Sequence, residues 1–217
     1  MLSADAIVEL HDQRTRAWHE ATEDAGEDSC QESCLGAGET DGAGGETANW
    51  LSLVVRQHRA NYDLWHIEDE ARAPGATDAE LAGVKRRVDT NNQLRNDLVE
   101  ELDRILLAWL EERGLPNPAA PLNSESPGLI VDRLSILALK IYHTGEEVKR
   151  GDAPQGHAYR NRERLAILQE QRADLAGCLD ALWRETLAGT RRIKLYRQLK
   201  MYNDPTLNPA VYRQPAP

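Results

Sequence analysis

Hydrophobic residues recur at three- and four-residue steps along most of the chain, which is the period of an α-helix. The first such segment covers residues 3–22, and the second runs from about residue 48 to residue 73, where a Pro-Gly pair follows. A third runs from residue 78 to residue 113, behind a threonine that can cap its first turn. No stretch alternates with the period of two that is typical of a half-buried strand. The pattern therefore predicts helices throughout.

Two further helices are predicted in the second half of the chain. A proline-rich connection over residues 113–128 precedes them. Residues 129–150 are apolar on nearly all sides, which is typical of a helix in the middle of a bundle. A longer helix is predicted over residues 158–200, with a break near Gly189. Five to six helices without strands predict an all-α antiparallel helical bundle in a single domain.

The net charge of −10 comes mainly from one segment. Residues 23–46 contain eight acidic residues, no Lys or Arg, and six of the fifteen glycines of the chain. Because this stretch has no apolar period, we predict a flexible acidic insertion over residues 23–47. The bundle domain is expected to span residues 1–203, followed by a C-terminal tail over residues 204–217.

Composition narrows the functional classes. Three cysteines, an odd number, and no visible secretory signal favour a cytoplasmic location. Cys30 and Cys34 lie in the acidic insertion and are interpreted as incidental thiols, because no second Cys or His pair stands at zinc-ligand spacing. The acidic charge disfavours nucleic acid as a partner, and no apolar run is long enough to span a membrane.

Polar residues on the second predicted helix lie on the face that should be buried. At about 100° per residue, His58 and Asp69 fall among the apolar residues of this face, with His66 at one edge. A carboxylate directed at the core needs a partner, because burying it unpaired costs several kcal/mol. Asp69 therefore predicts either a buried pair with Arg72 or a histidine, or a polar functional site.

The third predicted helix carries a continuous polar stripe. Five residues at steps of three and four form it: Asp89, Asn92, Asn96, Glu100 and Asp103. Asn and Asp are poor helix formers, each about 0.5 kcal/mol worse than Ala, so a merely solvated face would favour other residues. Short amides and carboxylates suit hydrogen bonds to a polar ligand, or a cation. The stripe indicates a ligand site, with a solvated face as the alternative.

Four ordered segments resemble one bacterial family. They are LWHIEDEAR, KRRVDTNNQLRND with Glu100 and Asp103, SPGLIVDRLSILALKIYH, and LKMYNDPTLNP. The family is the domain-of-unknown-function family numbered 4254, and the resemblance covers nearly the whole chain except the acidic insertion. It implies an all-helical fold with no assigned activity. Its members are often encoded beside glycosyltransferases, which implies a link to glycan or nucleotide-sugar metabolism. The family positions found here are Asn61, Trp65, His66, Glu68, Asp69, Arg72, Lys85, Arg86, Asp89, Asn92, Gln93, Arg95, Asn96, Asp97, Glu100 and Asp103.

The functional hypothesis is a helical-bundle enzyme that acts on a polar phosphorylated or glycosyl small molecule. A divalent cation, Mg²⁺ or Mn²⁺, is favoured because hard oxygen donors outnumber histidines in the stripe. The predicted metal ligands are Asp69, Asp97 and Glu100. The predicted catalytic residues are His66, Glu68 and Asp69, with His66 as general acid/base because imidazole titrates near neutral pH. The predicted substrate-binding residues are Asn61, Arg72, Lys85, Asp89, Asn92, Arg95, Asn96 and Asp103.

The alternative hypothesis is a non-catalytic adaptor that docks on a glycosyltransferase and uses the stripe as an interface. Under both hypotheses the protein could also be a homo-oligomer. Two further features complete the prediction. Asp132 and His143, about three turns apart, are interpreted as a buried network that locks a central helix. His19 follows Trp18 as His66 follows Trp65, so His19 is expected to contact the residues of the site without binding the ligand itself.

Overall fold

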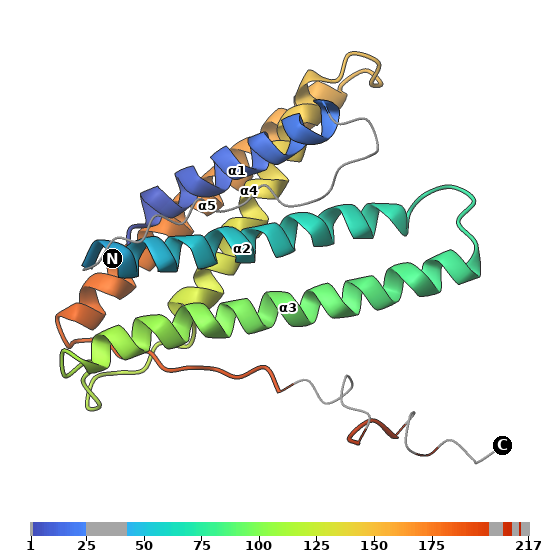
Figure 1. Ribbon diagram of the computed structural model, residues 1–217. Helices are drawn as coiled ribbons and strands as arrows, with labels where there is room; N and C mark the ends of the chain where they lie inside the picture. Colours follow the sequence, from blue (N-terminus) through green and yellow to red (C-terminus); the bar gives the residue numbers. More distant parts are fainter. Residues whose placement is uncertain (1, 25–42, 200–205, 210–212, 214–217) are drawn as a thin grey trace.

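The computed structural model describes residues 2–24, 43–199, 206–209 and 213. Five helices make up these residues: α1 (Ala4–Asp24), α2 (Ala43–Glu70), α3 (Asp78–Glu111), α4 (Pro127–Lys149) and α5 (His157–Leu187) (Figure 1). No strand occurs in the described parts of the chain, and the helices pack into one body, so the predicted all-α fold is confirmed. Most of the predicted insertion, including Cys30 and Cys34, lies outside the described residues, as does most of the tail.

Local sequence signals set several helix ends. Thr77 begins α3 with a capping box, in which its hydroxyl accepts from the Glu80 N–H and the Glu80 carboxylate accepts from the Thr77 N–H at 2.7 Å. Ser126 caps α4, and Pro127 occupies the first turn, where its missing N–H costs nothing. Both starting points lie within two residues of the predicted ones.

Helix α5 is shorter than predicted. It ends at Leu187, and Gly189 follows with a φ of 69°, a left-handed conformation that favours glycine. The chain then runs beside the proline-rich connection, where the Arg192 N–H donates to the Pro121 carbonyl at 3.0 Å. The prediction of helix up to residue 200 is wrong, because Gly189 ends the helix where only a break was expected.

The helices form two antiparallel hairpins, α2 with α3 and α4 with α5. In Figure 1, α2 and α3 lie side by side, while α1, α4 and α5 run across them at an angle. Helix α4 contacts each of the four other helices, and Ile130, Val131 and Leu134 on it are buried. The predicted central place of this helix is therefore confirmed.

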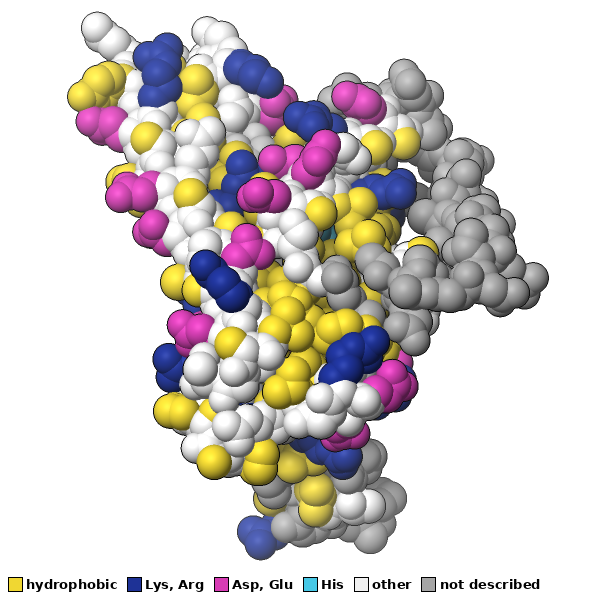
Figure 2. All heavy atoms as spheres, turned by 90° about the vertical axis from the view of Figure 1, so that its left-hand side faces the viewer, with side chains coloured by type: hydrophobic (Ala, Val, Ile, Leu, Met, Phe, Trp, Pro, Cys, Tyr) yellow, Lys and Arg dark blue, Asp and Glu magenta, His cyan; other side chains and the backbone are white. Residues whose placement is uncertain are grey.

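The surface of the bundle is mixed in character. On the face shown in Figure 2, hydrophobic side chains gather in the middle, with Lys, Arg, Asp and Glu interspersed around them. No single-sign patch forms on that face. None of the described helices is both long enough and apolar enough to cross a membrane.

Candidate functional site

A hydrogen-bonded polar network crosses the interior between α2 and α4. Oδ1 of Asp132 accepts from Gln57 at 2.6 Å and from Asn61 at 2.9 Å. Asn61 also donates to the Ser135 hydroxyl at 2.9 Å, and this hydroxyl lies 2.7 Å from Nδ1 of His58. All five side chains are buried. Asp132 therefore belongs to a buried hydrogen-bonded core network, as its sequence position predicted, whereas His143 lies elsewhere.

The network continues into α1 through Thr15. The Thr15 hydroxyl lies 2.9 Å from Nε2 of His58, and the ring of His11 packs 4.4 Å from that of His58. Burial lowers the pKa of His58 to about 3. Burial and the field of His58 lower the pKa of His11 well below its ordinary value. Both imidazoles are therefore neutral at pH 7.

Three histidines from three helices meet close to Thr15. His19 of α1, His66 of α2 and His143 of α4 each offer one ring nitrogen, and these nitrogens lie within 4.8 Å of one another. Nδ1 of His19 lies 2.7 Å from the Thr15 carbonyl oxygen. Because a carbonyl can only accept, Nδ1 carries the proton and Nε2 keeps its lone pair. Nε2 of His66 and Nε2 of His143 are buried and make no hydrogen bond within the described residues.

Aromatic rings constrain these imidazoles, which we call the histidine triad. Trp65 stacks on His143 with ring centroids 4.6 Å apart and an interplanar angle of 6°. Tyr142 stacks on His19 with centroids 4.2 Å apart. Stacking of this kind limits ring rotation, so the triad is largely preformed.

Two of the triad histidines, His66 and His143, are uncharged at neutral pH. Burial and the field of His19 lower the pKa of His66, and burial together with both other triad members lowers the pKa of His143 to about 4. The Asp69 carboxylate opposes both shifts, which places it within electrostatic range of the triad. Neutral imidazole is the form that binds metals, so the triad could hold a metal ion.

A cavity of about 440 Å³ lies between α2, α3 and α4, beside Trp65. We call it the Arg95 cavity. Its lining comprises Asn61, Leu64, Trp65, Glu68, Asp69, Arg72, Arg95, Ile136 and Leu139. Five of these residues are among the predicted site residues: Asn61, Glu68, Asp69, Arg72 and Arg95. The structure thus brings these five residues together around one hollow, in which Trp65 connects the lining to His143 of the triad.

Most of the predicted α3 stripe lies outside this cavity. Lys85 and Asp89 form an exposed ion pair one turn apart. Asn92 and Asn96 are half-buried and do not line the cavity. Of α3, only Arg95 reaches it. Much of the stripe is therefore a partly solvated face, the alternative that the sequence left open.

The structure does not bring the three predicted magnesium ligands together. Asp97 is exposed, and Glu100 lies almost one turn further along α3. Arg87 of α3 pairs with Glu70 of α2, so the neighbouring Asp69 lies opposite the turn around Arg87. Ten residues separate Arg87 from Asp97, which is about 15 Å along a helix. One ion cannot bridge that distance.

Asp103 is buried and makes hydrogen bonds to residues at the start of α4. Its Oδ1 accepts the Gly128 N–H at 2.7 Å, and the Ser126 hydroxyl donates to the same carboxylate. Burial raises the pKa of Asp103 to about 6, although both donors act in the opposite direction. The carboxylate ties α3 to the start of α4, so the structure gives no support to the substrate-binding role predicted for it.

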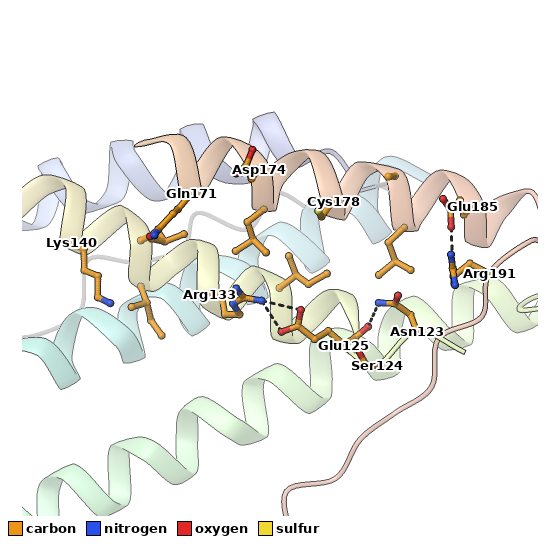
Figure 3. Close-up of a pocket in the computed structure, with 16 residues that line it drawn as sticks. Asn123, Ser124, Glu125, Arg133, Lys140, Gln171, Asp174, Cys178, Glu185 and Arg191 are labelled. Atoms are coloured by element: carbon orange, nitrogen blue, oxygen red, sulfur yellow. Dashed lines mark hydrogen bonds and ion pairs between the residues drawn. The ribbon is translucent and has the colours of Figure 1, made fainter. Parts of the chain in front are cut away.

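The largest of the described hollows, about 900 Å³, lies between α4 and α5 (Figure 3). Its charged side chains are mostly paired with each other: Arg133 with Glu125 at 2.8 Å, and Arg191 with Glu185 at 3.0 Å. None of the predicted site residues lines it. Its size alone indicates no chemistry, so we place the candidate site at the triad and the Arg95 cavity.

Sequence reasoning found part of this site. It selected His66 and Asp69, but it treated His19 as a supporting residue and His143 as part of the core network. One repeated signal could have found the triad, because each of its members directly follows a large aromatic residue on its helix. These pairs are Trp18-His19, Trp65-His66 and Tyr142-His143.

Fold and site together define the class: an all-helical bundle with a half-buried histidine triad beside a largely apolar cavity that also presents several charged side chains. The chain belongs to the DUF4254 family, described as a protein of unknown function, whose model matches residues 51–195. The matched range includes His66, His143 and the Arg95 cavity, whereas His19 precedes it, and the segment LKMYNDPTLNP follows it. No curated protein and no solved structure matches the chain.

Proposed function

We propose that this protein is a metal-dependent helical-bundle enzyme. His19, His66 and His143 hold a transition-metal ion of the Zn²⁺ class, and a polar small molecule binds in the adjoining Arg95 cavity. The observation that carries the proposal is the convergence of three imidazole nitrogens within 4.8 Å. Three imidazoles with one open position are the ligand set of a catalytic zinc site, and nitrogen donors favour zinc over Mg²⁺ or Mn²⁺.

The local structure fits such an ion. In a tetrahedral site with Zn–N bonds of about 2.0–2.1 Å, the ligand nitrogens lie about 3.4 Å apart. The triad nitrogens therefore have to approach one another by up to about 1.4 Å, which small side-chain rotations allow. The Thr15 carbonyl fixes the tautomer of His19, as outer partners of metal-bound histidines commonly do.

Asp69 links the proposed metal to the proposed substrate. Its carboxylate lines the Arg95 cavity and raises the pKa of two triad members against the effect of burial. A metal in such a site makes a bound water acidic and polarises an oxygen of the substrate. We assign Asp69 the role of accepting the proton of the attacking water. Trp65, Asn61 and Arg95 suit a phosphorylated or glycosyl substrate, because a ring face, an amide and a cation are all present.

The first test is metal content. Protein purified without chelator, then exchanged against Zn²⁺ or Co²⁺, is expected to retain about one ion per chain and to give the visible absorption of tetrahedral Co²⁺. His143→Gln and His66→Gln should lose the ion. His157→Gln is the matched control, because His157 is hydrogen-bonded to Glu147 at the start of α5 and stands apart from the triad. Equal metal content in His143→Gln and the parent would refute the metal site.

The second test is catalysis. Zinc-loaded protein is assayed for hydrolysis of p-nitrophenyl phosphate and p-nitrophenyl glycosides. Asp69→Asn is expected to keep the metal but to lose at least about a hundredfold of the rate, since it removes the proton acceptor. A protein that binds zinc yet hydrolyses neither probe class would contradict the enzymatic part. A protein that neither binds zinc nor turns over either probe would favour the adaptor of a glycosyltransferase.

A further inference from the structure

We infer that Arg95 forms an anion subsite at one end of the Arg95 cavity, built for the phosphate or carboxylate group of a small molecule. The inference rests on the proposed function and names the substrate class of the same site. It is carried by the hydrogen bonding of Arg95, which differs from that of the other cations near the cavity.

Arg95 is a largely buried cation with unused donors. Its side chain is 24% exposed, and it lines the cavity. Nε is buried without a hydrogen-bond partner, and no other Arg95 nitrogen donates to a described residue. A guanidinium has five N–H donors, and buried donors in folded proteins are nearly always satisfied. Nε lies beside the Asp132 carboxylate on the core side, so the donors left for a ligand group in the cavity are those of the two Nη nitrogens.

Asp132 holds Arg95 without using up its donors. Oδ1 of Asp132 lies 3.5 Å from Nε of Arg95, which is an ion pair but not a hydrogen bond. The same oxygen already accepts from Gln57 and Asn61. The carboxylate therefore stabilises the charge of Arg95 from the core side, while the planar fork of the guanidinium stays available. This fork matches the two oxygens of a carboxylate or phosphate.

Arg72 on the rim of the cavity is different. It is exposed and already pairs with Glu68 at 3.2 Å. It can add charge at the entrance but cannot replace the buried fork. The anion subsite therefore depends mainly on Arg95, with Arg72 in a minor role.

The cavity also sets the length of the ligand. Asn61, whose partner Asp132 pairs with Arg95, marks one end, and Asp69 beside the histidine triad marks the other. Eight residues of helix separate these two positions, which is about 12 Å. A ligand that reaches both ends has one anionic group and a polar body that lies along Trp65. A sugar phosphate or a hydroxylated carboxylic acid has this form.

Binding of inorganic phosphate and of acetate, followed by calorimetry, tests the subsite and distinguishes the two anion classes. Phosphate or acetate should bind the parent protein, and Arg95→Gln should weaken that binding about tenfold or more. Arg104→Gln is the matched control, because Arg104 lies on the same helix and pairs with exposed Glu101 outside the cavity. If Arg95→Gln does not fold, Arg72→Gln serves as the second variant, and a smaller loss is expected.

Two outcomes would overturn the inference: no binding of either anion by the parent protein, or equal binding by the parent protein and Arg95→Gln. His143→Gln separates this result from the proposed function, because it should lose zinc yet still bind the anion. Anion binding that disappears in His143→Gln but persists in Arg95→Gln would place the anion on the metal. That result would refute the Arg95 subsite while supporting the metal site.

Discussion

Replacing Asp103 with asparagine tests whether this residue belongs to the fold or to the ligand site. The carboxyl group is only 2% exposed, and burial raises its pKa from 3.8 to about 6 despite the donors at Ser126 and Gly128. Above pH 6 the group is ionised in both the folded and the unfolded protein, so folding must then bury a charge. Asparagine keeps an acceptor oxygen for the Gly128 N–H and carries no charge.

The magnitude follows from the two pKa values. As the pH rises, the unfolded protein loses this proton before the folded protein does, so the free energy of unfolding falls between pH 4 and 6. At about 1.36 kcal/mol for each unit of pKa, the interval from 3.8 to 6 corresponds to about 3 kcal/mol. Asp103→Asn escapes this loss. It should therefore be more stable than the parent at pH 7.5 by about 3 kcal/mol, and the gain should shrink toward zero at pH 4.

Urea unfolding followed by tryptophan fluorescence at pH 4.5, 6 and 7.5 measures the difference. Asp97→Asn on the same helix is the control; its side chain is exposed, so its stability should stay within about 0.5 kcal/mol of the parent at each pH. A loss of stability in Asp103→Asn that is the same at every pH would refute the argument. It would mean that the negative charge itself holds α4 in place.

Three further predictions concern the core, all read from urea unfolding. Gly128→Ala should cost about 1–3 kcal/mol, because an added Cβ would lie 2.7 Å from the Val99 carbonyl oxygen; no loss would mean that α3 and α4 can separate freely. Leu134→Ala should cost about 2–5 kcal/mol and Leu137→Ala less, because Leu134 is fully buried and Leu137 only partly; the reverse order would contradict the position of α4. From pH 7 to pH 5 the free energy of unfolding of the parent should fall by about 2 kcal/mol relative to that of His58→Gln. The reason is that His58 takes up a proton in the unfolded chain, with a pKa of 6.5, but not in the folded protein, where its pKa is about 3. Parallel pH profiles of the two proteins would disprove this.

The helices could be predicted because their signals are local. Thr77 with Glu80, and Ser126 with Pro127, mark helix starts within a few residues of sequence, and the apolar period defines the inner faces. The end of α5 was missed because a glycine in an otherwise helical pattern can be tolerated or can end the helix. Which outcome occurs depends here on the pairing of Arg192 with Pro121, a contact between distant segments.

The site was only partly predictable, for a related reason. The helical period of α2 placed Asp69 on the inner face with Asn61 at its edge, whereas Glu68, which also lines the cavity, was selected through the family resemblance. The histidine triad instead depends on how α1, α2 and α4 meet, and a single-helix period contains no such information. The prediction of a Mg²⁺ or Mn²⁺ site relied on the α3 stripe, but carboxylates that share one helix face need not face the same neighbouring helix. Asp103 ends against α4, whereas Asp97 faces solvent.

The buried network connects the two parts of the candidate site, which are the histidine triad and the Arg95 cavity. Thr15 belongs to both, because its hydroxyl contacts His58 and its carbonyl oxygen contacts His19 of the triad. At the far end of the same network, Asp132 lies beside Arg95. A core built only for stability would fill such positions with apolar side chains, since buried polar groups give little net stabilisation even when they are satisfied. The network contacts the triad at Thr15 and Arg95 at Asp132, so in the proposed site it would hold polar groups from four helices at fixed positions.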